Sequence, residues 1–119
     1  TRERISEIIR ALNDLFGDDL SEADRLKQAS NLAAVSELVG RDATVGKQLA
    51  ANNSEEQMMQ GGDLQRAVTS AVMALLVDNR DGETADALLK DGDKMSSYAR
   101  LVFKLLAGGI SRDDLSRLA

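Results

Sequence analysis

The stretch DLQRAVTSAVMALL, residues 63–76, carries the clearest amphipathic pattern in the sequence. Its apolar residues recur at intervals of three and four, which is the spacing of one face of an α-helix. Gly61 and Gly62 stand before it, so we expect a new helix that is capped at its start by Asp63. The expected inner face comprises Leu64, Ala67, Val68, Ala71, Val72, Leu75 and Leu76.

Four more helical segments are expected upstream, each with its own boundary signal. Gly17 is placed to end the first segment, and Ser21 is placed to cap the second. Asp42 can cap a short third segment, and Ser54 with Gln57 matches a capping box at the start of the fourth. The segments comprise residues 5–17, 21–40, 42–50 and 54–59, and the apolar positions of the second include Leu26, Ala29, Leu32, Ala33 and Val35.

Downstream, the sequence predicts a short helix that closes around Gly92, then a longer helix, then a last turn capped by Ser111 with Asp114. No strand-like alternation of β-branched residues occurs anywhere in the sequence. Residues 1–119 are therefore expected to form a single all-α domain, a compact bundle of six or seven helices with short loops. The inward positions of the last two segments are Met95, Tyr98, Leu101, Val102, Leu105, Leu106, Leu115 and Leu118.

The composition excludes several kinds of chemistry. The chain has neither cysteine nor histidine, which removes disulfides, thiolate metal sites, cysteine nucleophiles and the usual general base near neutral pH. Serine, threonine and lysine are present, but without histidine they form no recognisable catalytic triad. We expect no catalytic, cofactor-binding or metal-binding residue in this chain.

Two loop sequences resemble ligand loops only superficially. The double glycine at residues 61–62 is followed by Asp63, not by the Lys-Ser or Lys-Thr of a phosphate loop. The sequence DNRDGE, residues 78–83, matches three inner positions of a calcium loop, but Val77 and Leu88 would occupy its first and twelfth positions. Both stretches are interpreted as breaks between helices.

The charge distribution disfavours nucleic acid and membrane partners. Fifteen basic residues are scattered among twenty acidic ones, and the net charge is −5. Strong autonomous DNA binding needs a basic face, so it is expected only if folding gathers the arginines on one side. No apolar run approaches the roughly 20 residues that span a bilayer, so a soluble, cytoplasmic protein without membrane contact is expected.

Three segments carry a resemblance to a known family. ISEIIRALNDLFG (residues 5–17), LSEADRL (20–26) and QLAANNSEEQM (48–58) resemble, in order and spacing, the C-terminal helical region of the R subunits of type I restriction enzymes. In that family an aromatic residue usually stands where this chain has Met58, and the Gly-Gly sequence at 61–62 has no evident counterpart. The second half of the chain is similar only in its rhythm of helices and loops.

The resemblance implies a non-catalytic assembly domain at the C-terminal end of a much longer R subunit. The nuclease domain and two helicase-like motor domains of such a subunit would precede Thr1, and ATP and magnesium would bind there. This chain would dock the motor subunit onto the methyltransferase and specificity subunits, and would meet DNA through the complex.

Within this resemblance, Leu12, Phe16 and Gly17 are expected to shape the fold. Four polar residues that a core would not require are the candidate partner contacts, namely Asn13, Asn52, Asn53 and Gln57. A structural alternative is that Asn53 and Gln57 serve only as helix caps. An unrelated helical adaptor or regulatory module is the alternative to the restriction enzyme as a whole.

Overall fold

The computed structural model describes residues 2–79 and 82–118, and every regular element in these ranges is an α-helix. The expected all-α bundle is thus confirmed. The described ranges contain eight helices, not six or seven, because the short expected segments at residues 54–59 and after Ser111 each form a separate helix. They are α1 (Arg2–Phe16), α2 (Glu22–Gly40), α3 (Ala43–Ala50), α4 (Glu55–Gln60), α5 (Asp63–Asn79), α6 (Gly82–Lys90), α7 (Gly92–Ala107) and α8 (Arg112–Leu118).

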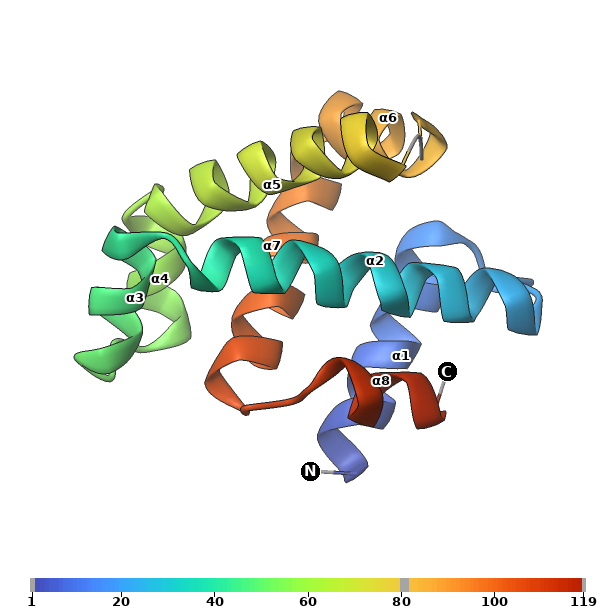
Figure 1. Cartoon of the computed structure of the whole chain (residues 1–119), viewed down its shortest axis with the longest axis horizontal. Coiled ribbons are helices and arrows are strands. Elements are labelled where there is room, and N and C mark those ends of the chain that lie inside the picture. The colour runs from blue at the N-terminus through green and yellow to red at the C-terminus, as the bar shows by residue number, and fades with distance from the viewer. Residues whose placement is uncertain (1, 80–81, 119) are drawn as a thin grey trace.

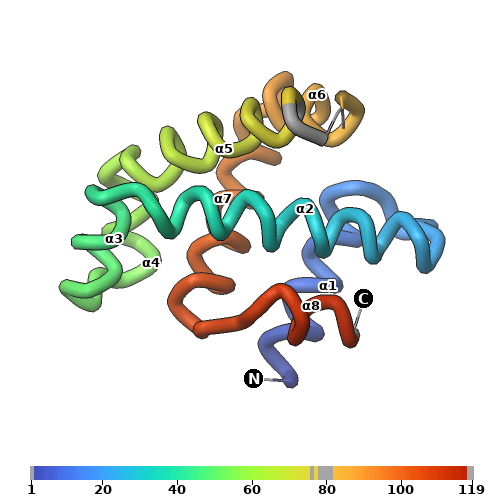
Figure 2. Tube along the Cα trace, viewed as in Figure 1, coloured from blue at the N-terminus to red at the C-terminus, as the bar shows by residue number. Residues whose placement is uncertain are grey.

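Helix α2 is the central element of the bundle. It crosses the front of the molecule in Figure 1, with α5 alongside it and α7 passing behind, and it contacts α1, α3, α5, α7 and α8. Helices α3 and α4 lie together at one end of the molecule. The tube in Figure 2 shows the N- and C-termini on the same side, where α1 packs against α8.

The core consists almost entirely of the aliphatic positions that the helical spacing predicted. Tyr98 is fully buried and meets Phe16 edge to face at 6.2 Å between ring centroids, which joins α7 to α1. The expected core positions Leu76 and Leu118 lie outside the residues whose side chains are described. The largest fully buried side chains include Ile8, Leu12, Leu32, Met58, Leu64, Leu88 and Leu115.

Helix α2 departs from the expected single apolar stripe. Gln28, Asn31 and Ser36 are buried on it, whereas Leu26, expected inside, is 46% exposed. At 3.6 residues per turn, Leu26 lies roughly 120° around the helix from the centre of the buried face. The expectation for Leu26 was therefore wrong, because α2 has helices on several sides and its buried face follows their positions.

Most predicted helix boundaries are confirmed by hydrogen bonds. Gly17 has a φ of +119°, and its N–H donates to the Asn13 carbonyl at 2.8 Å, which ends α1. The Ser21 hydroxyl accepts from the Asp24 amide at 3.1 Å at the start of α2. Before α4, the hydroxyl and the amide side chain of the predicted capping box accept each other's backbone N–H groups. These local sequence signals act as expected.

Two expected boundary roles are wrong. Asp63 is the first residue of α5 instead of its cap, and its carboxylate accepts from Gln48 Nε2 at 3.1 Å and pairs with Arg66. The Asp63 carboxylate, which was expected to cap α5, thus binds Gln48 of α3 instead. Gly92 does not close α6 but opens α7, because the Asp91 carboxylate accepts the two amides that follow Gly92 and fixes the start of α7 there.

Candidate protein-docking surface

The four polar candidates from the sequence do not form one site. Asn52, Asn53 and Gln57 lie in and after the turn between α3 and α4, at one end of the molecule. Asn13 lies on α1, on the other side of the bundle (Figure 1). A partner that contacted all four would have to reach around the bundle.

Within the α3–α4 turn, two of the candidates have structural roles. Asn52 adopts the left-handed conformation, with φ of +58°, which asparagine tolerates better than most residues. Gln57 Oε1 accepts from the Ser54 amide at 3.3 Å, so its side chain is part of the capping box. The Asn53 backbone amide donates to the Gln48 carbonyl at 3.3 Å, and its side chain is half-buried. Asn52 and Gln57 nevertheless remain exposed to solvent.

Asn13 is not an open contact residue. It is half-buried, and its side-chain oxygen Oδ1 is enclosed without a hydrogen-bond donor. The enclosed Asn13 oxygen is therefore not available to a partner in this structure.

Three hollows in the described surface differ in their linings. The largest, about 420 Å³, lies between the C-terminal part of α2, the start of α3 and the first half of α5, and we call it the α2–α5 groove. A second, about 250 Å³, lies where the α1–α2 connection, α2 and α6 meet. A third, about 230 Å³, lies between α2, α7 and α8.

The α2–α5 groove combines an apolar floor with a charged rim. Leu38 is 38% exposed at its edge, whereas Val39 and Ala71 are buried beneath it. On the α5 side, Ala67, Ser70 and Ala71 are small, and Arg66 is the one long side chain of the lining. Its lining consists of Leu38, Val39, Arg41, Asp42, Arg66, Ala67, Ser70 and Ala71.

The charges at this groove balance one another. Arg41 is exposed and has no ion-pair partner in the described ranges, whereas Arg66 pairs with Asp63. Asp42 is the acidic residue of the lining, and its Oδ1 already accepts the Thr44 and Val45 amides at 2.9 and 3.1 Å. With Asp63 included, two arginines and two aspartates leave the groove without net charge.

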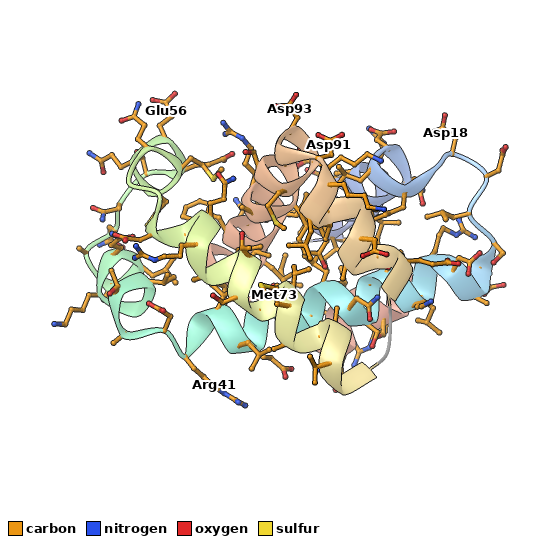
Figure 3. The ribbon with its side chains drawn as sticks, turned by 90° about the horizontal axis from the view of Figure 1, so that it is seen from above. Asp18, Arg41, Glu56, Met73, Asp91 and Asp93 are labelled. Carbon is orange, nitrogen blue, oxygen red and sulfur yellow. The ribbon has the colours of Figure 1, made fainter. Side chains whose placement is uncertain are left out.

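Figure 3 shows where five of the exposed charged side chains lie. Arg41 points outward at one edge of the molecule, and the labelled acids Asp18, Glu56, Asp91 and Asp93 lie along the opposite edge.

The other two hollows contain buried polar groups. In the α1–α2–α6 hollow, Gln28 Nε2 donates to Thr84 Oγ1 at 3.0 Å, and Gln28 Oε1 has no hydrogen-bond partner. In the α2–α7–α8 hollow, the Ser36 hydroxyl is buried without a partner, beside an ion pair between Arg112 and Glu37 at 3.2 Å. Each hollow has room for water, which commonly satisfies such groups.

The described residues offer little for other ligand classes. Three arginines are neutralised by ion pairs, those of Arg66 with Asp63, Arg100 with Glu55 and Arg112 with Glu37. Within the described ranges, no three acidic side chains come together in a way that would hold a metal ion. None of the helices in the described part of the chain has both the length and the apolar character needed to cross a bilayer.

The groove was missed in the sequence because its parts are unremarkable there. Leu38 lies beyond the last expected inward position of its helix, Arg41 follows as one of fifteen basic residues, and Ala67 was assigned to the core. The crossing of α2 with α5 brings these residues together, and no local signal encodes that crossing.

Comparisons with protein-family models, with curated proteins and with solved structures find no significant match to this chain.

Proposed function

We propose that this chain is a non-catalytic assembly domain of the R subunit of a type I restriction enzyme. It would dock the ATP-dependent DNA translocase and nuclease onto the methyltransferase and specificity subunits, in the cytoplasm, as part of a defence against foreign DNA. ATP, magnesium and DNA would bind elsewhere in the complex.

The observation that carries this proposal is the place of the three resembling segments in the fold. Residues 5–17 form α1 with its glycine end, residues 20–26 form the capped start of α2, and residues 48–58 form the α3–α4 turn with its capping box. Each segment includes a helix boundary and the residues that define it.

The surface supports an assembly role in the same chain. A groove with an exposed leucine, an apolar floor and two arginines is suited to a protein partner. An unrelated helical adaptor would present a similar groove, and it is the second candidate for that reason. The two candidates differ in the partner that they predict.

Light scattering after size exclusion tests the proposal, with the 119-residue chain alone and then mixed with its cognate methyltransferase–specificity complex. Co-elution as a stable species at micromolar concentrations is the expected result. Separate elution would contradict autonomous docking, and capture of a different protein by the groove would favour the adaptor.

A further inference from the structure

Helices α3 and α4 with the turn between them lie at one end of the bundle (Figure 1), and we call these residues, 43–60, the α3–α4 arm. The structure describes the whole arm, and the side chains that it buries are Val45 and Met58. Leu49 and Met59 pack against the core while partly exposed. Helix α7, which is of similar length, buries six residues. The apolar contacts that hold the arm are therefore few for its length.

Polar contacts between side chains also join the arm to α5 and to α7. Gln48 Nε2 of α3 donates to Asp63 Oδ2 of α5 at 3.1 Å, and Glu55 of α4 pairs with Arg100 of α7 at 2.9 Å. The ion pair is exposed, and such pairs stabilise a fold only slightly. Gln48 Oε1 is enclosed without a hydrogen-bond donor. Opening of the arm would hydrate this oxygen, so the closed form includes an unfavourable contribution that the open form lacks.

The two ends of the arm allow a change of backbone direction. The connection from α4 to α5 is the double glycine at residues 61–62, and Gly62 has a φ of +77°. Between α2 and α3, Arg41 and Asp42 lie outside both helices. Inside the arm, the Asn53 amide bonds a carbonyl of α3, and the capping box holds the start of α4. The arm can therefore move as a whole while its own hydrogen bonds stay formed.

We infer that the α3–α4 arm opens as one unit, away from α2, α5 and α7, while the remaining helices stay folded. Opening separates Val45 and Met58 from these helices, whereas unfolding of the whole chain also disrupts the core that α1, α2, α7 and α8 share. The opening therefore costs less free energy than global unfolding. It exposes the surfaces of α5 and α7 that the arm covers. The inference concerns the free chain and does not depend on the proposed function.

Amide hydrogen exchange measured by NMR at increasing urea concentration tests this inference. Relative to their unfolded rates, amides of α3 and α4 are expected to exchange at least about tenfold faster than those in the middle of α2. Their exchange should respond to urea with one common slope that is smaller than the slope for α2, because opening exposes less surface than global unfolding. A slope equal to that of α2, slopes near zero, or different slopes for α3 and α4 would each overturn the inference.

Two substitutions of buried residues distinguish opening of the arm from global unfolding. Ile8→Val, on α1, should speed exchange in the middle of α2 about two- to tenfold and leave exchange in the arm unchanged, because the Ile8 contacts survive when the arm opens. Val45→Ala should speed exchange in both places, because the Val45 contacts are lost in both events. An equal response of the arm and α2 to Ile8→Val would overturn the inference. Circular dichroism of each variant checks that the fold is retained.

The absence of cysteine in the sequence allows a second measurement of the same opening. Met58→Cys on the arm and Val102→Cys on α7 each place a single thiol at a fully buried position. Relative to its rate in the urea-unfolded chain, the thiol of Met58→Cys is expected to react with a soluble disulfide reagent at least about tenfold faster than that of Val102→Cys. Equal relative rates for the two variants would overturn the inference.

Discussion

The hydrogen bond between Gln28 and Thr84 joins α2 to α6 across 56 residues of sequence. Both residues are buried, at 8% and 3% exposure, and the Gln28 side-chain oxygen lacks a partner. Without the Thr84 hydroxyl, neither the Nε2 nor the Oε1 of the Gln28 side chain would form a hydrogen bond here. Removal of the Gln28 amide would instead eliminate a polar group that is already incompletely satisfied.

We predict that Thr84→Val destabilises the fold by about 1–3 kcal/mol, because a buried donor loses its acceptor. The entropy of unfolding is about 2.1 cal/mol/K per residue, or about 250 cal/mol/K for this chain, so Tm should fall by about 4–12 °C. Gln28→Met should change the free energy of unfolding by less than about 1 kcal/mol, because its lost hydrogen bond is offset by burial of an apolar group. In the Gln28→Met background, Thr84→Val should cost about 1 kcal/mol less than in the unmodified chain.

Urea unfolding followed by far-UV circular dichroism gives the free energy of unfolding of the unmodified chain, of the two single variants and of the double variant. These four values form a double-mutant cycle. Other contacts of the Thr84 hydroxyl cancel when the two backgrounds are compared. Thr69→Val is the matched control, because the Thr69 hydroxyl bonds the Gln65 carbonyl within its own helix at 2.8 Å. Equal costs of Thr84→Val in both backgrounds would show that the two side chains are not coupled, and would refute the reasoning.

Four further changes test the packing and the caps. Leu32→Ala, at a fully buried position of α2, should cost about 2–5 kcal/mol in urea unfolding, and a loss below 1 kcal/mol would contradict the central place of α2. Ser54→Ala should cost about 0.5–2 kcal/mol through loss of the capping box, and Ser54→Asp should restore most of it. Gly108→Ala should cost about 1–3 kcal/mol, because a Cβ there would lie 2.9 Å from the Lys104 carbonyl oxygen; an unchanged Tm would contradict this contact. The Ser111 backbone amide and then its hydroxyl lower the pKa of Asp114, so the cap of α8 should be stable above the ordinary carboxyl pKa and be lost as pH falls through the lowered value. Hydrogen exchange of the α8 amides measures this, and the same pH response in Asp114→Asn would contradict it.

The parts of the fold that sequence could predict are those encoded over a few residues. The α5 stripe and the capping box at Ser54 depend on neighbours three or four positions away, and both form as expected. Asp63 and Gln28 were not predictable in this way. Asp63 bonds Gln48 on another helix, and Gln28 bonds a threonine 56 residues away, so their roles depend on the tertiary arrangement.

The candidate site also depends on the tertiary arrangement, so it could not be predicted from neighbouring residues. Leu26 and Leu38 are both exposed leucines on α2, and each lies roughly 120° from the centre of its buried face, on opposite flanks. Their local sequences do not distinguish a leucine at a groove from one on an open flank. The distinction arises because α5 crosses α2 beside Leu38, and this crossing is set by core residues elsewhere on both helices.

The core residues that set the crossing of α2 and α5 also hold the groove in shape. The two walls of the α2–α5 groove are joined by buried residues of the common core, including Val35 and Val39 of α2 and Val68 and Val72 of α5. A protein partner would therefore meet a groove that is already shaped in the free chain, and little conformational entropy would be lost from the groove on binding. On this side of the interface, the remaining cost lies in ordering the side chains of Leu38 and Arg41. Substitutions that loosen the α2–α5 packing beneath the groove, such as Val68→Ala, should then weaken binding without altering any contact residue, a coupling that a flexible binding loop would not show.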